Sequence, residues 1–309
     1  MKIAVFGGTG FVGSYIVDEL LNSGYNINIL VRDGSEDKIA NIDKCNVIKG
    51  DIDNSDSISS TLQDCEAVIY NIGIIREFPS EGITFENLHY ECLKSVIDIS
   101  KEKNIKRFIL MSANGVKPSG TGYQETKYKA EVYLRANIRD WTIIRPSLIF
   151  GDSKGKDEFC SQLKKDMLLL PFPAPAFFSG INFLSAGKFE MSPVHVKDVA
   201  KIFVDCINNN HAFKKVYELG HKNYNWKEII SIISSAYGKN KMTIPAPVQP
   251  IYLVALLLDK FKWFPISCDQ LTMLLEGNTC DGSLVFKRYS IDPIEFKSSN
   301  LNYLLNGKK

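Results

Sequence analysis

A run of glycines near the start of the chain has the spacing of a loop that binds phosphate groups. The segment Val5-Phe-Gly-Gly-Thr-Gly-Phe-Val-Gly13 satisfies G-x-G-x-x-G through Gly8, Gly10 and Gly13. Gly7 and Gly8 would allow a tight turn, and Gly10 would let a pyrophosphate approach the backbone. Gly13 would let the following helix pack closely on the preceding strand, and the N–H groups at the helix start would face the phosphates. An ordinary tight turn is the alternative.

The glycine run therefore predicts a dinucleotide site, because it lies between a short apolar segment and an amphipathic one. The residues of this run that are expected to bind the cofactor are Gly7, Thr9, Gly10, Phe11, Val12 and Gly13.

The end of the second apolar segment bears on the choice between NAD and NADP. An acidic residue there would bind the ribose hydroxyls of NAD, whereas arginine suits the extra phosphate of NADP. The segment reads Ile29-Leu-Val-Arg-Asp33. If the strand ends at Val31, Arg32 is placed for the phosphate, which favours NADP. NAD stays possible, because a shift of one residue would put Asp33 near the ribose, and Arg32 could also be a solvated charge.

Tyr123 and Lys127 are the candidates for proton transfer. They lie four residues apart on a predicted helix, which places them on one face. A nearby cation lowers the pKa of a tyrosine, so the phenol could exchange a proton with a carbonyl or alcohol while a nicotinamide exchanges a hydride. The alternatives are a partly buried phenol beside a solvated charge and a pairing shifted by one, through Tyr128.

Ser112 is the candidate for a third catalytic group, a hydroxyl that donates to the substrate oxygen. It lies in Leu110-Met-Ser-Ala-Asn-Gly115, where Ala113 could occupy that position instead and Asn114 is a second possible donor. His195 is expected to be a structural, hydrogen-bonding residue. No histidine or cysteine spacing is typical of a metal site, so none is expected.

Alternating strands and helices would position these residues. Nearly continuous apolar segments separated by amphipathic ones predict a parallel sheet covered on both faces, in a doubly wound α/β fold. The predicted strands are Ile3–Phe6, Ile27–Val31, Asn46–Ile48, Ala67–Tyr70, Arg107–Met111 and Trp141–Ile144. The predicted helices between them are Phe11–Asn22, Ser57–Leu62, Phe85–Lys103 and Tyr123–Ala136.

This pattern changes after Arg145-Pro-Ser147, which predicts a second region. We expect residues 1–150 and 191–222 to form the dinucleotide-binding Rossmann domain. Residues 151–190 and 223–309 would form a smaller, mainly helical cap that contacts the substrate.

Two apolar stretches of this cap have no assigned role. Prolines exclude a continuous helix in Leu168–Phe178, which could line a greasy pocket, dock on a partner or be a surface loop. The helix predicted over Ile251–Phe264 ends in Lys260-Phe-Lys-Trp-Phe264, which suits a membrane interface or an apolar partner. Core packing is the alternative.

Composition limits the class of protein. The 309 residues are 45% hydrophobic and 23% charged, with 37 basic and 35 acidic residues. This balance gives no footprint for nucleic acid or for an anionic membrane. Seven cysteines without a C-x-x-C pattern favour a reducing compartment. The first strand begins at Lys2 without a signal peptide, and no apolar run could span a bilayer. We expect a cytoplasmic protein. Any association with a membrane would be through a partner protein.

Several motifs together resemble the atypical short-chain dehydrogenases/reductases, in particular the NmrA-like group that includes the accessory subunit of respiratory complex I. The motifs are the glycine run, Leu30-Val-Arg-Asp33, Gly50-Asp51, Tyr123-x-x-x-Lys127, Ile144-Arg-Pro146, Pro193-Val-His-Val-Lys-Asp-Val-Ala200 and Tyr217-Glu-Leu-Gly220. The resemblance implies that Asp51 and Ile52 lie by the adenine ring and Gly73 under the ribose and pyrophosphate. It also implies that Pro146 lies near the nicotinamide and that Lys127 binds the nicotinamide ribose.

Two functions are consistent with this resemblance. The first is an NADPH-dependent oxidoreductase or redox isomerase acting on a small, apolar molecule, which the pair Tyr123 and Lys127 favours. The second is an NADPH-binding protein without turnover, a sensor or an assembly or stability subunit of a respiratory or quinone-related complex. The uncertain role of Ser112 favours the second. The substrate and the oligomeric state are not encoded in any motif.

Overall fold

The computed structural model describes residues 1–259 and 261–306. The chain divides into two compact units. The first comprises Met1–Pro146 and Val196–Glu218, and the second comprises Ser147–His195 and the chain from Leu219 onward. Compared with the boundaries expected from the sequence, residues 147–150, 191–195 and 219–222 belong to the second unit.

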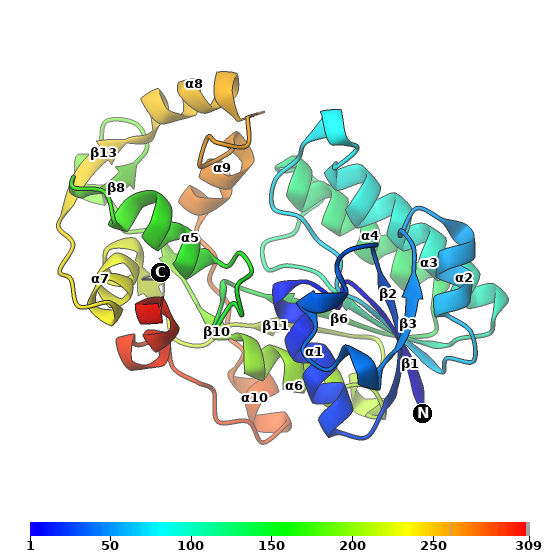
Figure 1. Ribbon diagram of the computed structural model, residues 1–309. Helices are drawn as coiled ribbons and strands as arrows, with labels where there is room; N and C mark the ends of the chain where they lie inside the picture. The colour runs from blue at the N-terminus through cyan, green and yellow to red at the C-terminus, as the bar shows by residue number, and fades with distance from the viewer. Residues whose placement is uncertain (260, 307–309) are drawn as a thin grey trace. The chain divides into compact units, whose positions relative to one another are not determined.

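A seven-stranded sheet forms the centre of the first unit (Figure 1), with the strand order β11-β6-β5-β4-β1-β2-β3. β1 pairs in parallel with β2 and β4, β2 with β3, and β5 with β4 and β6. The strands are β1 (Lys2–Phe6), β2 (Asn26–Val31), β3 (Asn46–Lys49), β4 (Ala67–Tyr70), β5 (Arg107–Met111), β6 (Asp140–Pro146) and β11 (Lys215–Leu219). This order confirms the predicted doubly wound fold, and its direction reverses at β1, where such folds bind ligands.

Helices cover both faces of this sheet. α1 and α6 pack against each other on one face, and α3 packs against α2 and α4 on the other (Figure 1). The helices are α1 (Phe11–Asn22), α2 (Ser55–Thr61), α3 (Cys92–Glu102), α4 (Gly122–Asn137) and α6 (Val196–Asp205). A π-helix, η4 (Glu86–Glu91), leads directly into α3. The predicted helix over 85–103 is therefore present, but its first turns are wider than those of an α-helix.

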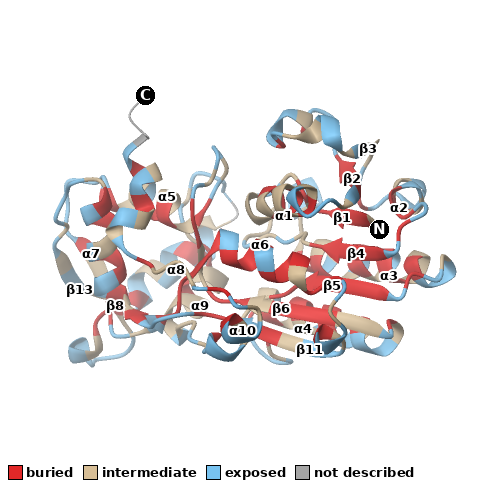
Figure 2. Ribbon diagram, turned by 90° about the horizontal axis from the view of Figure 1, so that it is seen from below, coloured by how far each residue is buried: buried red, intermediate tan, exposed pale blue. Residues whose placement is uncertain are grey.

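The central strands are buried, as the absence of alternation in their sequences predicts (Figure 2). Ile3, Ala4, Val5 and Phe6 of β1 have no exposed surface, and every residue of β4 and β5 is buried. The sheet is therefore a rigid support for the loops at the carboxyl ends of its strands.

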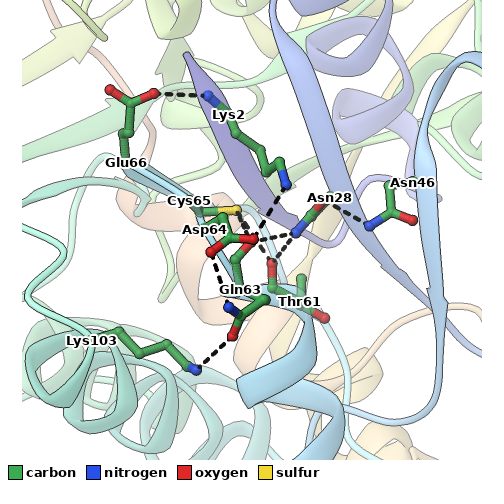
Figure 3. Close-up of polar contacts among 9 residues, drawn as sticks. All are labelled: Lys2, Asn28, Asn46, Thr61, Gln63, Asp64, Cys65, Glu66 and Lys103. Atoms are coloured by element: carbon green, nitrogen blue, oxygen red, sulfur yellow. Dashed lines mark hydrogen bonds and ion pairs between the residues drawn. The ribbon is translucent and has the colours of Figure 1, made fainter.

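Buried polar contacts hold the opposite end of the sheet together (Figure 3). Asn28 of β2 is 1% exposed, and its side-chain amide donates to the backbone oxygens of Thr61 and Gln63. Its side-chain oxygen accepts a hydrogen bond of 2.9 Å from Asn46 of β3. A shallow hollow lies here, and the satisfied Asn28 beneath it has a structural role, since it joins β2, β3 and the end of α2.

The second unit contains short strands and five α-helices within the described residues. The strands are β7 (Ile149–Phe150), β8 (Ala174–Phe178), β9 (Glu190–Met191), β10 (Val194–His195), β12 (Tyr224–Asn225) and β13 (Thr243–Pro247). The helices are α5 (Phe159–Leu163), α7 (Trp226–Ala236), α8 (Val248–Leu258), α9 (Cys268–Glu276) and α10 (Ser283–Arg288), and a 3-10 segment covers Ser298–Asn306. The helix predicted over 251–264 ends earlier than expected, at Leu258, and Lys260 lies outside the described residues. Among the described helices, none is both long and apolar enough to cross a membrane.

One extended pairing in this unit was not predicted from the sequence. β8 and β13 form a parallel pair in which Ile244 lies opposite Pro175 and Pro245 opposite Ala176. The prolines exclude a helix, as expected. The two short strands can still pair, because both are edge strands of a two-stranded sheet, and edge strands tolerate proline.

Candidate functional site

The glycine turn joins β1 to α1 in a conformation that only glycine adopts easily. Gly7 has a φ of +88°, and a Cβ atom on it would lie 2.8 Å from the carbonyl carbon of Asn71. A Cβ atom on Gly13 would lie 2.1 Å from the backbone oxygen of Gly7. These two glycines therefore let the turn pack on β4 and let α1 pack on the turn, as their spacing predicts.

Gly10 differs, because the protein itself leaves room for a side chain there. It is exposed and is the N-cap of α1, and a Cβ atom on it would meet only the backbone oxygen of Gly7, at 3.4 Å. No side chain caps this helix and its first turn has no acidic residue. The N–H groups in the first turn of α1 and the positive end of its dipole are thus available to an anion. Gly10 has no side chain that would obstruct the anion.

The ends of β2 and β3 lie next to this turn and carry the residues expected around the adenosine. β2 ends at Val31, so Arg32 is the first residue beyond the strand, and its side chain is exposed. The backbone N–H of Gly50 donates to Val31, which brings Asp51 alongside. The carboxylate of Asp51 accepts a hydrogen bond of 2.7 Å from the N–H of Ile52, whose side chain is buried.

The loop after β4 lies between the glycine turn and α4. Asn71 donates through its side chain to the backbone oxygen of Gly7, at 3.4 Å, and its own N–H donates to Phe6. Two residues later, a Cβ atom on Gly73 would lie 3.1 Å from Nζ of Lys127. Glycine at 73 therefore lets the backbone lie directly against the ammonium. Asn71 was not predicted, although a polar residue directly after a buried strand was a signal for it.

Lys127 is a buried cation with few partners. It is 5% exposed, and among the described residues its ammonium makes one hydrogen bond, to the backbone oxygen of Met111 at 3.1 Å. Burial lowers the pKa of Lys127 to about 8, although the charge of Glu131 opposes this effect. An ammonium has three N–H donors, so two remain for another molecule.

Tyr123 lies one helical turn before Lys127, as the spacing predicts. A capping box of Thr121 and Gln124 starts α4 and so places Tyr123 in its first turn. The Lys127 ammonium is 6.0 Å from the centre of the Tyr123 ring. The lysine was expected to lower the pKa of Tyr123, but this was wrong: burial raises that pKa to about 12, so the phenol is protonated at neutral pH.

His89 on the π-helix supports this pair, and the sequence reasoning missed it. Its ring meets that of Tyr123 edge to face at 5.3 Å and stacks on Phe85. Nε2 lies 3.1 Å from both N and O of Ile74, and Nδ1 lies 3.1 Å from the hydroxyl of Thr126. Burial, followed by the charge of Lys127, lowers the pKa of His89 to about 2, so the ring is neutral. A π-turn often marks a functional site, but this one is visible only in the structure, so it gave no sequence signal for His89.

Ser112 lies at the end of β5, but its hydroxyl is already engaged. It donates to a carboxylate oxygen of Glu131 at 2.6 Å. Glu131 is fully buried and also accepts from Arg135 at 2.7 Å and from Arg145 at 2.8 and 2.7 Å. Ser112 could donate to a substrate only after its bond to Glu131 is broken, and its catalytic role stays a prediction.

The predicted residues of the first unit thus gather at one edge of the sheet. Pro146 ends β6 at this edge, where its backbone oxygen accepts from the N–H of Asn114 at 2.9 Å. His195 lies on β10 of the second unit, against the ring of Phe150. The arrangement offers an anion site at α1, a cation after β2, and a phenol and an ammonium beyond β4 and β5. Those groups suit a dinucleotide, a ligand in which phosphate groups join two nucleosides.

The first half of the chain is similar to a family of known proteins. Residues 7–166, just over half of the chain, match the model of the NAD(P)H-binding family. A crystal structure of UDP-glucose 4-epimerase from Thermus thermophilus in complex with NAD has the same fold. Its TM-score is 0.73, with 14% sequence identity over 99% of this chain and 98% of that one.

Two mitochondrial proteins are similar in sequence. The 40 kDa subunit of NADH-ubiquinone oxidoreductase from Neurospora crassa is 26% identical over 97% of this chain and 78% of its own length. Subunit 9 of the NADH dehydrogenase [ubiquinone] 1 alpha subcomplex from Mus musculus is 27% identical over 79% of this chain. The alignment covers 63% of the mouse protein, less than two thirds of its length. The resemblance to short-chain dehydrogenases/reductases with complex I relatives is confirmed.

Proposed function

We propose, from the premise that this chain belongs to the NAD(P)H-binding family, that it binds NADPH at the carboxyl ends of β1, β2 and β4 and reduces a small carbonyl compound. The glycine turn, Gly73 and Lys127 would hold the pyrophosphate and the nicotinamide ribose. Arg32 supports NADPH over NADH, because an exposed guanidinium directly after β2 can form charge-assisted hydrogen bonds with the extra phosphate.

The buried ammonium of Lys127 is the observation that carries this proposal. A charged group that is 5% exposed and bonded to a single backbone oxygen is costly unless another molecule completes its hydrogen bonds. Ribose hydroxyls are suitable acceptors, and glycine at 73 keeps a side chain away from the ammonium, since a Cβ atom there would lie 3.1 Å from Nζ. The residues present therefore fit the cofactor.

Tyr123 would supply the proton. When bound, NADPH supplies the hydride that reduces the carbonyl carbon. Tyr123 holds a proton on its hydroxyl at neutral pH, since its pKa is about 12, and donates it to the carbonyl oxygen. The positive charge of Lys127 stabilises the phenolate that remains, which then takes a proton from water. The net change consumes NADPH, the carbonyl compound and one proton, and yields NADP⁺ and an alcohol.

Removal of the Tyr123 hydroxyl tests the proposal. We expect Tyr123→Phe to bind NADPH as the wild type does and to lose about 10²- to 10⁴-fold in turnover, the contribution of general acid catalysis. Tyr128→Phe, a change on the same helix, is the matched control and should keep its activity. The measurement is NADPH oxidation in a screen of quinones, ketones and nucleotide sugars. Equal turnover of Tyr123→Phe and wild type would exclude the mechanism.

A second function is supported by a specific observation. Glu131 engages the hydroxyl of Ser112, and the fungal and mouse relatives are named as subunits of the NADH–ubiquinone enzyme. On this proposal the chain holds NADPH without turnover and stabilises a respiratory complex. Tight NADPH binding with no oxidation in the screen, together with comigration of the chain with such a complex on native gels, would support it over the reductase.

A further inference from the structure

The second unit carries an apolar helix whose outer face is left exposed by the described residues. α8 (Val248–Leu258) buries Val248 and Ala255 against Leu271 of α9. Its other side exposes a run of large apolar side chains: Tyr252 (38%), Leu253 (64%), Val254 (45%), Leu256 (55%) and Leu257 (71%). A helix with two apolar faces is typically buried on both of them. Figure 1 shows α8 at the margin of its unit.

The exposed surface continues beyond the helix with two aromatic side chains. Phe261 is 43% exposed and Trp263 is 70% exposed, and their rings stack at 6.2 Å. We call these seven residues, 252–254, 256, 257, 261 and 263, the α8 surface. Tryptophan at the end of an apolar face is typical of helices at a membrane interface, because the ring is largely apolar but its N–H can reach water.

Basic residues flank the α8 surface in the sequence. No charged residue occurs from Met242 to Leu258, and residues 239–264 contain four lysines and one aspartate. Lys239 before this stretch and Lys262 after it have exposed side chains. An uncharged apolar face between lysines complements an anionic lipid surface, in which acyl chains lie beneath negative headgroups.

We infer that the α8 surface inserts into one face of an anionic lipid bilayer and lies parallel to it. Eleven helical residues extend about 16 Å, too short to cross the hydrocarbon core. The stretch offers few groups for the polar rim of a protein interface, since only Thr243, Gln249 and Tyr252 have polar side chains between 242 and 258. The inferred contact is directly with lipid, whereas the sequence predicted attachment to a membrane through a partner. It does not depend on the proposed reductase activity.

Sedimentation with vesicles tests this inference. The purified full chain is mixed with phosphatidylcholine vesicles that contain or lack phosphatidylglycerol. We expect binding to the anionic vesicles, weakened about tenfold or more without phosphatidylglycerol and also weakened by high salt. Leu253→Ser/Leu257→Ser should bind about 10- to 100-fold less tightly, because two exposed leucines no longer enter the bilayer.

Two controls separate lipid insertion from a loss of folding. Leu284→Ser/Leu305→Ser changes two equally apolar exposed residues outside the α8 surface and should bind as the wild type does. Brominated lipids should quench the fluorescence of Trp263, and Trp263→Phe should remove the quenched component. Absence of sedimentation, equal losses in both double variants or no quenching would overturn the inference. A dimer in lipid-free buffer that Leu253→Ser/Leu257→Ser dissociates would overturn it in favour of self-association.

Discussion

Replacement of Lys127 by methionine should stabilise the cofactor-free protein while it abolishes cofactor binding. In the folded chain the pKa of Lys127 falls from 10.5 to about 8 because the ammonium is buried. At 1.36 kcal/mol per pKa unit, this fall corresponds to about 3 kcal/mol of free energy that opposes folding below pH 8. Loss of the hydrogen bond to Met111 costs about 1 kcal/mol. The expected gain at pH 7 is about 2 kcal/mol, or about 4–8 °C in Tm.

The pH dependence of this gain identifies its cause. The unfolded lysine keeps its proton up to about pH 10.5, whereas the folded one loses it near pH 8. The penalty in the wild type is therefore complete below pH 8, declines as the pH rises to 10.5 and is absent above it. The advantage of Lys127→Met should vanish over the same range.

Thermal unfolding with and without NADPH is the assay. The control is Lys129→Met, which removes an exposed lysine of the same helix that pairs with Glu86 of the π-helix, and which should change stability by less than about 1 kcal/mol. NADPH should raise the Tm of the wild type and of the control but not that of Lys127→Met. A Lys127→Met protein that is less stable than the wild type at pH 7, or equally stabilised by NADPH, would refute the reasoning.

Three further outcomes follow from the same contacts. Arg32→Ala should weaken NADPH binding about 10- to 150-fold, since a charge-assisted contact contributes about 1.5–3 kcal/mol, and should leave NADH binding unchanged. Calorimetric titration measures both, and an equal loss for the two cofactors would contradict this prediction. His89 should add no pH dependence to NADPH binding between pH 5 and 7, because its pKa is about 2, and NADPH affinity should fall as Lys127 deprotonates above pH 8. Glu131→Gln should lower the free energy of unfolding in urea by about 3–5 kcal/mol, because it leaves Arg145 without its buried carboxylate; a smaller effect than about 1 kcal/mol would show that the pair is dispensable.

The sheet and its glycine turn could be predicted because local sequence determines them. The central strands β1, β4 and β5 are short, mostly apolar runs, and Gly7 and Gly13 are required by contacts within the turn or with the residues directly after β4. The spacing of Tyr123 and Lys127 likewise translates directly into one face of α4.

The supporting contacts of the site could not be predicted in this way. His89 meets Ile74, 15 residues away, only because a π-helix turns its ring toward the loop after β4. Ser112 was considered as a free donor, but Glu131 reaches it across 19 residues. Such pairings depend on how the sheet places helices against loops. No periodicity in the sequence encodes them.

Binding of NADPH at the α1 terminus is the central claim, and Gly10→Val tests it most directly. The protein leaves room for a Cβ atom at this position, since only the backbone oxygen of Gly7 lies within 4 Å, so the variant should fold. Its side chain would occupy the place of the pyrophosphate. Titration calorimetry should show NADPH binding to the wild type and none to Gly10→Val, with the same circular dichroism spectrum for both. A folded Gly10→Val protein that binds NADPH as the wild type does would contradict the account.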